Sequence, residues 1–265
     1  MKPIKGVSFM FLNIYGIFKM TDTDIYGIDY YYTYTPHPLC DDISFIEPDE
    51  ELYDLLIKAN KLIGTLDGLL MSGNVRDVYI DLILADEAYY SCLIDGYNLT
   101  FLDFIRKNRQ KDKYLYNYTN TLNNCPAKQV AKKQMCEMHH QLFGDKDSFL
   151  VGNYRDKIIY LTPLLIIKSE RYNPTSPKDI EPAMKDLFSF INKKTVFDML
   201  VKSALIHYQF EAIHPFEAEN GIIGRILTLL SIMYDDYLIK PAINLSKYLH
   251  LYKVEYFDRL EAVHT

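Results

Sequence analysis

Two apolar stretches joined by a short polar segment constrain the fold of this chain more than any other feature. Residues 196–213 and 222–234 both place apolar side chains at helical spacing. Pro215 makes continuation of the first helix unfavourable, because proline lacks the backbone N–H that a helix interior requires. Asn220 and Gly221 are typical of a turn, after which the second helix begins. The sequence therefore predicts two buried helices connected by a loop.

The rest of the chain is also mostly helical in pattern. Residues 49–70 carry apolar residues every three to four positions, which predicts a long amphipathic helix. For the helix near residue 100, either Asn98 or Thr100 can serve as the N-cap. Further helices are expected over residues 78–91, 98–109, 124–143, 180–191 and 246–263. Residues 152–167 favour extended structure and predict a short hairpin, so the expected fold class is all-α with one small β-hairpin.

Composition excludes several classes of protein. The 265 residues include 29 Lys and Arg and 35 Asp and Glu, and 49% are apolar, which is typical of a folded chain rather than a disordered one. A net charge of −6 gives no basic excess, so we expect no nucleic-acid partner. The four cysteines do not form a disulfide scaffold, and Cys125 and Cys136 with His139 and His140 lack the paired spacing of zinc modules. Reduced thiols in the cytoplasm are expected.

The first 45 residues are expected to form an N-terminal extension. Within it, residues 7–18 are an apolar run after Lys2 and Lys5, which resembles a signal peptide. No small-residue cleavage site follows, so a buried helix or strand is the preferred interpretation and a signal the alternative. The run is too short to span a bilayer, and no membrane association is expected.

The loop between the two buried helices carries a set of residues suited to phosphate chemistry. A helix N-terminus offers free N–H groups and a dipole that favour an anion. Gly221 and Gly224 allow close approach, and Arg225 can add a forked contact to a phosphate. His214, at the other end of the loop, can remove a proton from a hydroxyl. Phosphate-anhydride chemistry is one hypothesis, and an ordinary helix–loop–helix connection is the alternative.

The window from Ala204 to Arg225 resembles the signature of the Fic family, H-P-F-x-[D/E]-G-N-G-R-x-x-R. The similarity covers most of residues 45–260: residues 61–68 match an early helix, residues 152–155 a flap, and residues 245–248 with Tyr256 the closing helix. The resemblance implies a Fic-type helical bundle with one small β-hairpin flap. It assigns residues 46–265 to this domain, with the core motif at 207–230.

The resemblance also implies roles for individual residues. His214 would be the general base, Phe216 an anchor for the loop, and Arg225 a ligand of the terminal phosphate. Asn220 and Gly221 would line the phosphate site, whereas Gly224 is placed there by the loop pattern alone. The flap that docks the target protein would be formed by Tyr154, Arg155, Ile158 and Ile159.

A second similarity is regulatory. Residues 91–96 resemble the family's inhibitory helix motif, [S/T]-x-x-x-E-[G/N], with Ser91 in the first position and Asp95 in the Glu position. In the family this acid pairs with the arginine that matches Arg225 and prevents productive placement of ATP. The alternative interpretation is a plain helix C-terminus that stops at Gly96.

Three positions of the loop depart from the family pattern. Ala218 stands at the usual metal-ligand position, Glu219 replaces a glycine, and Ile222 replaces the first arginine. An alanine side chain cannot bind Mg²⁺, which takes oxygen ligands, although Glu217 or Glu219 could supply one from a neighbouring position. The departures predict weak or altered activity.

Three functional hypotheses follow from the resemblance. The first is a nucleotidyltransferase that moves AMP from ATP to a Ser, Thr or Tyr hydroxyl of a target protein, under autoinhibition. The second is a catalytically inactive Fic fold that binds a partner, through residues 154–161. The third is a transferase that uses another phosphate-containing donor. A homo-oligomer is compatible with each.

Overall fold

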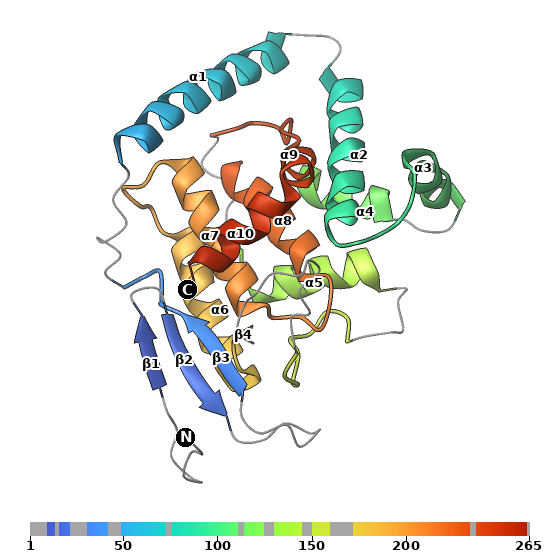
Figure 1. The fold of residues 1–265 in the computed structure, drawn as a ribbon. Helices are drawn as coiled ribbons and strands as arrows, with labels where there is room; N and C mark the ends of the chain where they lie inside the picture. The colour runs from blue at the N-terminus through green and yellow to red at the C-terminus, as the bar shows by residue number, and fades with distance from the viewer. Residues whose placement is uncertain are drawn as a thin grey trace.

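The computed structural model describes residues 10–13, 16–21, 31–41, 49–72, 76–110, 114–124, 130–144, 150–159, 172–233 and 237–263. Its helices are α1 (Glu50–Ser72), α2 (Arg76–Ile94), α3 (Phe101–Gln110), α4 (Tyr114–Asn124), α5 (Lys132–Phe143), α6 (Pro177–Asn192), α7 (Met199–Ile213), α8 (Asn220–Ile232), α9 (Leu245–Leu251) and α10 (Lys253–Ala262). Its strands are β1 (Met10–Asn13), β2 (Gly16–Thr21), β3 (Tyr31–Pro36) and β4 (Tyr172–Asn173). The predicted helical bundle is confirmed, with a small sheet at one end (Figure 1).

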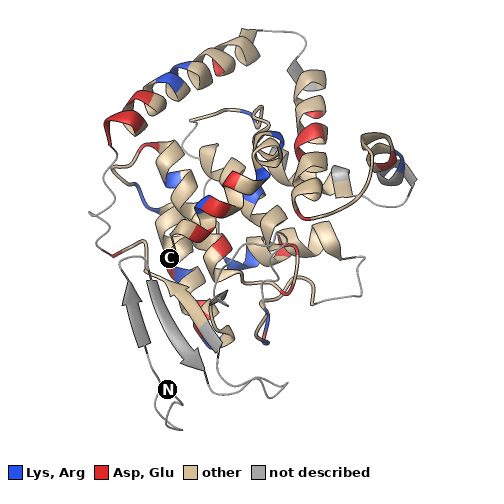
Figure 2. Ribbon diagram, viewed as in Figure 1, with Lys and Arg blue, Asp and Glu red and all other residues tan. Residues whose placement is uncertain are grey.

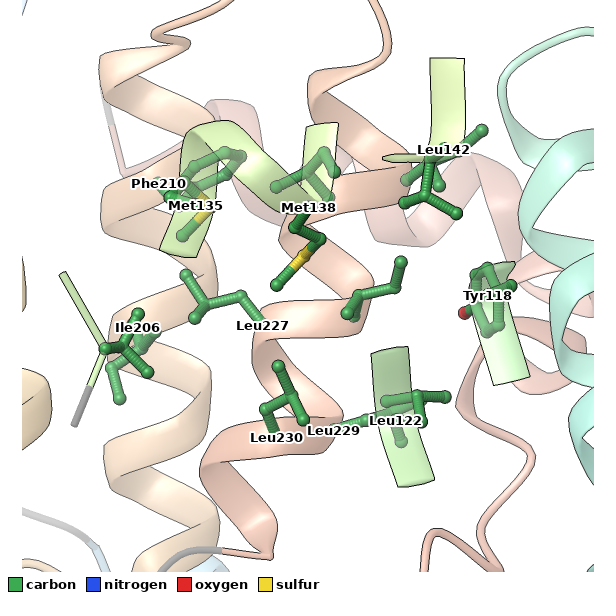
Figure 3. Packing of buried hydrophobic residues seen from close by; sticks show 14 of the residues in the cluster. Tyr118, Leu122, Met135, Met138, Leu142, Ile206, Phe210, Leu227, Leu229 and Leu230 are labelled. Carbon is green, nitrogen blue, oxygen red and sulfur yellow. The ribbon is translucent and has the colours of Figure 1, made fainter. Parts of the chain in front are cut away.

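Helices α7 and α8 lie at the centre of the bundle, as the two apolar stretches predict. Nearly every residue of α8 is buried. Figure 3 shows side chains of α4, α5 and α7 meeting those of α8, among them Met138, Phe210 and Leu227. Burying one such side chain contributes about 2 kcal/mol, so the packing around α8 supplies much of the stability. The loop between α7 and α8 is therefore carried on the most deeply buried pair of helices.

Several helix boundaries differ from the predicted ones for identifiable reasons. Helix α7 begins at Met199 because the Asp198 side chain caps it, accepting from the Leu200 N–H at 2.9 Å. Thr100 caps α3 through a 3.2 Å bond from the Asp103 N–H. The expected helix over 246–263 is divided into α9 and α10 at Tyr252.

One helix was missed and another starts later than predicted. Helix α4 is rich in Tyr and Asn, which are weak helix formers, so its sequence gave no helical signal. Helix α4 is stabilised by its packing, because Tyr118 and Leu122 are fully buried in the core. The helix predicted over 124–143 begins at Lys132, and its proposed first turn at Pro126 lies outside the described residues.

The N-terminal extension forms a sheet on the bundle. Strands β1, β2 and β3 pair antiparallel in that order, and β4 joins β3 in parallel register. A helix or a strand was expected over residues 7–18, and the described residues of this range form strands. The Tyr34 hydroxyl lies 3.0 Å from that of Tyr208 on α7, and Thr175 Oγ1 donates to the Tyr34 carbonyl at 3.0 Å. The extension thus packs directly on the helix that leads into the loop, and its boundary near residue 45 stays a prediction.

Helices α2 and α9 are joined by two acidic side chains of α2. Glu87 is fully buried and accepts hydrogen bonds from the Ser246 N–H, at 2.7 Å, and from the Ser246 hydroxyl. Asp86 accepts from Asn244 and from the Lys247 ammonium, both at 2.9 Å. Figure 2 shows acidic and basic residues interspersed along the helices, in keeping with the mild net charge. No helix in the described parts of the chain is both long and apolar enough to cross a bilayer.

The buried Glu87 predicts a dependence of stability on pH. Burial raises its pKa to about 7, against 4.5 for an ordinary Glu. Folding therefore favours protonated Glu87. This stabilisation is fully present below pH 4.5, the ordinary pKa, and is lost as the pH rises through about 7, the pKa in the folded protein. In urea unfolding, the unfolding free energy of the wild type should therefore fall between pH 5 and pH 8. We expect Glu87→Gln, which does not titrate, to make this fall smaller by about 1–3 kcal/mol. The exposed control Glu137→Gln should leave it unchanged, and an equal fall in both variants would contradict the assignment.

Candidate functional site

The loop from His214 to Glu219 begins and ends in an unusual backbone conformation. His214 has φ 53° and Glu219 has φ 64°, and both lie in the left-handed region that non-glycine residues rarely adopt. Glu219 stands where the Fic signature has a glycine, so this chain holds a strained residue at the position that most favours Gly. Such strain persists only where surrounding contacts determine the conformation.

Asn220 supplies one of those contacts. The Phe216 N–H donates to Asn220 Oδ1 and Asn220 Nδ2 donates to the Phe216 carbonyl, each at 2.9 Å. The Asn220 side chain is buried, and Phe216 is fully buried. The described contacts of the Asn220 amide thus close the loop and place Phe216 in the core, which is a different role from the predicted one of lining a phosphate site.

His139 on α5 is a second contact, and it was not predicted as a site residue. Its ring stacks on Phe216, with centroids 4.0 Å apart and planes 14° from parallel. The Gly152 N–H donates to His139 Nδ1 at 3.0 Å, so Nε2 carries the proton and donates to the Ala218 carbonyl at 3.2 Å. This role could not be predicted, because His139 lies far from the loop in the chain and matches no local motif.

The predicted flap packs against the loop without forming the expected hairpin in its described part. Residues 152–159 form no strand, and residues 160–167 lie outside the described residues. The Arg155 N–H donates to the Pro215 carbonyl at 2.9 Å, so the described part of the segment is bonded to the loop. Tyr154 is half-buried against the Phe216 ring at 5.7 Å, Ile158 and Ile159 are half-buried, and the Arg155 side chain is buried.

His214 has the properties required of a base. Its Nδ1 lies 3.3 Å from the Glu211 carbonyl, which leaves Nε2 available. Burial lowers the pKa of His214 to about 4, and the positive charge of Arg155 contributes to the shift. The imidazole is therefore neutral at physiological pH and able to accept a proton.

The N-terminus of α8 holds a carboxylate of the chain itself. Arg225 is buried and donates to Asp95 Oδ1 at 2.8 Å, to Ser91 Oγ at 2.9 Å and to the Ser91 carbonyl at 2.9 Å. The Ile222 backbone lowers the pKa of the Asp95 carboxyl, and a Cβ added at Gly221 would lie 2.7 Å from Asp95 Oδ1, so this carboxylate lies against the first turn of α8. The fold therefore brings Ser91, Asp95 and Arg225 together, at the position where the sequence predicts an anion site.

The two glycines of this region make room for carboxylates. A Cβ added at Gly221 would lie 2.7 Å from Asp95 Oδ1, so the glycine permits the close approach of Asp95. A Cβ at Gly224 would lie 2.2 Å from Glu211 Oε1. Gly224 thus accommodates Glu211, rather than the phosphate that the loop pattern suggested.

The carboxyl groups next to Arg225 are shifted by burial. Burial raises the pKa of Asp95, and the Arg225 charge opposes that shift. Burial also raises the pKa of Glu211 to about 7. Its Oε1 has no hydrogen-bond partner among the described residues. On the other side of the site, Lys253 Nζ lies 3.4 Å from the Leu93 carbonyl in the last turn of α2.

The residues present do not fit a Mg²⁺ site. Ala218 offers no side-chain oxygen, Glu217 Oε2 accepts from the Leu150 N–H at 2.7 Å, and Glu219 Oε1 accepts from the Tyr97 hydroxyl. No group of three or more His, Cys, Asp or Glu suited to a metal ion occurs among the described residues. The two glutamates suggested as substitute ligands are thus engaged with other elements.

A further set of polar residues ties α10 to the site. His207 Nε2 lies 2.8 Å from the Tyr256 hydroxyl, and its Nδ1 lies 2.9 Å from Thr228 Oγ1. Thr228 donates to the Gly224 carbonyl at 2.8 Å, so Nδ1 of His207 carries the proton and Nε2 accepts from Tyr256. The Arg225 charge also lowers the pKa of Tyr256, so the closing helix lies close to the arginine of the motif.

Comparison with known proteins agrees with this geometry. The Fic/DOC family pattern matches residues 129–232, which include α5, the loop and α8. This part of the chain is therefore similar to the Fic/DOC family. The chain is 26% identical over 107 residues to "Protein adenylyltransferase fic-1" of Caenorhabditis elegans, a match that covers 40% of this chain and 20% of that protein. The chain thus matches a fifth of the length of this relative.

Two solved structures share the Fic fold. A Fic family protein from Desulfovibrio desulfuricans G20 superposes with a TM-score of 0.66 at 18% identity, over 79% of this chain and 65% of that one. A Fic domain containing signaling protein from Bacteroides thetaiotaomicron superposes with a TM-score of 0.55 at 20% identity, over 72% of this chain and 79% of that one. At these identities the likeness extends to the fold alone.

The contact between Gly221 and Asp95 can be tested by substitution. We expect Gly221→Ala to lower the unfolding free energy by about 1–3 kcal/mol, because the added methyl group meets the Asp95 carboxylate. The same change made together with Asp95→Ala should cost less than the sum of the two single changes, as measured by urea unfolding. Gly68→Ala is the control, since nothing lies within 4 Å of its added Cβ. Strict additivity would contradict the contact.

Proposed function

We propose that this protein transfers AMP from ATP to a Ser, Thr or Tyr hydroxyl of a target protein. One observation carries the proposal: a single loop joins a neutral, half-buried His214 to a helix N-terminus where Arg225 already binds a carboxylate. The base and the anion site are thereby held at a fixed separation. The Fic/DOC domain and the adenylyltransferase name of the relative support the same reaction class.

In the proposed reaction, His214 removes the proton from the target hydroxyl. The hydroxyl oxygen forms a bond to the α-phosphorus of ATP, the bond from that phosphorus to the bridging oxygen of the β-phosphate breaks, and pyrophosphate leaves. The N–H groups at the start of α8 and the Arg225 guanidinium would bind the phosphate oxygens. No step is assigned to a metal ion, because Ala218 and its neighbours do not fit one.

We further propose that the arrangement described above is autoinhibited. The Asp95 carboxylate accepts from the Arg225 guanidinium and lies against Gly221 in the first turn of α8. A phosphate bound there would need the same guanidinium and the free N–H groups of that turn. Its side chain is one methylene shorter than the glutamate of the family motif, and Gly221 permits the closer approach that this requires. Displacement of Asp95 would open the site.

Activity is expected to be lower than in a protein with the full motif. Ile222 is fully buried and offers no charge in place of the first arginine, and Ala218 offers no ligand. Loss of one cation and one metal ligand costs several kcal/mol of transition-state stabilisation. A cytoplasmic setting is proposed on the free thiols of Cys40, Cys92 and Cys136. A homo-oligomer remains an expectation.

Relief of inhibition tests the proposal. With ATP labelled on the α-phosphate and a mixture of cell proteins, Asp95→Ala should increase protein labelling at least about tenfold, because Arg225 is freed for phosphate. Asp95→Ala/His214→Ala should abolish labelling while calorimetry still detects ATP binding. Asp81→Ala on the exposed side of α2, and His140→Ala, are the matched controls.

The alternatives correspond to other outcomes of the same experiment. If Asp95→Ala binds no nucleotide, the chain is a Fic fold that acts as a protein-interaction module, as the three substitutions in the loop would allow. If it binds UTP or a CDP-linked donor in preference to ATP, the donor differs. Either outcome would contradict AMP transfer.

Restoring the metal ligand provides a separate prediction. In the Asp95→Ala background, we expect Ala218→Asp to make ATP binding dependent on Mg²⁺, with the Kd lowered about tenfold, because a carboxylate then stands at the ligand position. Ala218→Asn has nearly the same shape without the charge and serves as the control. Titration calorimetry with and without Mg²⁺ measures both, and an equal effect of Asn and Asp would refute the charge argument.

A further inference from the structure

The segment from residue 150 to 159 inserts one charged side chain into the core. Arg155 is buried, whereas its neighbours Asn153 and Asp156 are exposed. A buried guanidinium is costly unless its donors are satisfied, so its contacts indicate what it does.

Those contacts gather on the end of α7 and the start of the loop. Arg155 Nε donates to the His214 carbonyl at 2.8 Å, and a terminal nitrogen donates to the Ile213 carbonyl at 3.3 Å and to that of Thr175. The other terminal nitrogen donates to the Lys157 carbonyl at 2.9 Å. With the backbone bond to Pro215, Arg155 binds three successive carbonyls, of residues 213–215.

A cation stabilises the end of α7 in two ways. The last carbonyls of a helix have no partner within it and carry the negative end of its dipole, which a buried positive charge stabilises. The left-handed conformation of His214 is strained and must be held by its surroundings. The bond from Arg155 to the His214 carbonyl holds the residue whose imidazole would act as the base.

The same guanidinium acts on the charge of the imidazole. After burial, Arg155 is the largest cause of the lowered pKa of His214, and the Glu211 carbonyl on α7 opposes the shift. The nearby carboxylates are directed elsewhere: Glu217 accepts from the Leu150 N–H, and Glu211 Oε1 lies against Gly224. The charge that acts on the His214 imidazole is therefore the positive charge of Arg155, which favours the neutral form of the imidazole.

We propose that Arg155 is a positioning residue for His214, which fixes the last turn of α7 and keeps the imidazole uncharged, rather than a contact for the target protein. The proposal rests on the proposed function only in taking His214 as the base. It replaces the docking role that the flap resemblance implied for Arg155, because its buried donors are already bound to carbonyls.

Titration of His214 by NMR tests the proposal without any activity. The signal is assigned by its loss in His214→Asn. Arg155→Gln keeps a donor but removes the charge, and should raise the pKa of His214 by roughly one unit. Arg155→Lys keeps the charge and should leave the pKa near that of the wild type. Arg259→Met, an exposed arginine on α10, is the control.

The variants separate the proposal from a merely structural role. A structural role alone would lower the urea midpoint of both variants and leave the titration of His214 unchanged in Arg155→Gln, and that result would overturn the proposal. If Arg155→Gln does not fold, Arg155→Lys decides: a His214 pKa raised as far as the ordinary value of 6.5 despite the retained charge would also overturn it.

Activity supplies a second readout. In the Asp95→Ala background, labelling requires neutral His214, so it falls as the pH drops below the pKa of this residue. Arg155→Gln should move that fall to higher pH and lower kcat about tenfold, with KM for ATP changed less than about threefold. If Asp95→Ala labels nothing, the proposed function fails, and the NMR titration still decides the role of Arg155.

Discussion

The ion pair between buried Arg225 and half-buried Asp95 is the contact on which the arrangement of α2, α8 and the loop depends. A fully buried guanidinium without a partner would be strongly destabilising, so the end of α2 must lie where Asp95 and Ser91 can reach it. The same contact fills the N-terminus of α8. The interaction that stabilises this arrangement is thus the one that would block the proposed anion site, so an ATP phosphate would have to compete with Asp95 for Arg225 unless Asp95 is replaced.

The central elements of the site could be predicted because they are encoded locally. Apolar spacing predicted α7 and α8, Pro215 and Asn220 predicted the loop, and helix N-terminus electrostatics predicted an anion site beside Arg225. The pairing of Ser91 and Asp95 with Arg225 followed from the family resemblance, since the residues lie far apart in sequence, and the fold brings them together. Its inhibitory role stays a prediction.

What could not be predicted depends on contacts between distant segments. Helix α4 forms through burial of Tyr118 and Leu122, which its local composition does not signal. The role of His139 depends on three partners from other elements, and no spacing rule identifies them. Arg155 was placed on a docking surface by its motif, whereas the fold turns its side chain inward. In each case tertiary packing, which a single sequence does not contain, determines the outcome.

The contacts that hold the loop are separate from those that a phosphate would use. Asn220 bonds to Phe216, His139 to Ala218 and Arg155 to the carbonyls before them, and all three act on the loop backbone. Because backbone contacts do not depend on the side chains at 218, 219 and 222, these positions can diverge while His214 and Arg225 keep their places. Even Glu219, in a conformation suited to glycine, is accommodated with its side chain bound to Tyr97. The backbone contacts that hold the loop are thus compatible with side chains at positions 218, 219 and 222 that differ from the family signature.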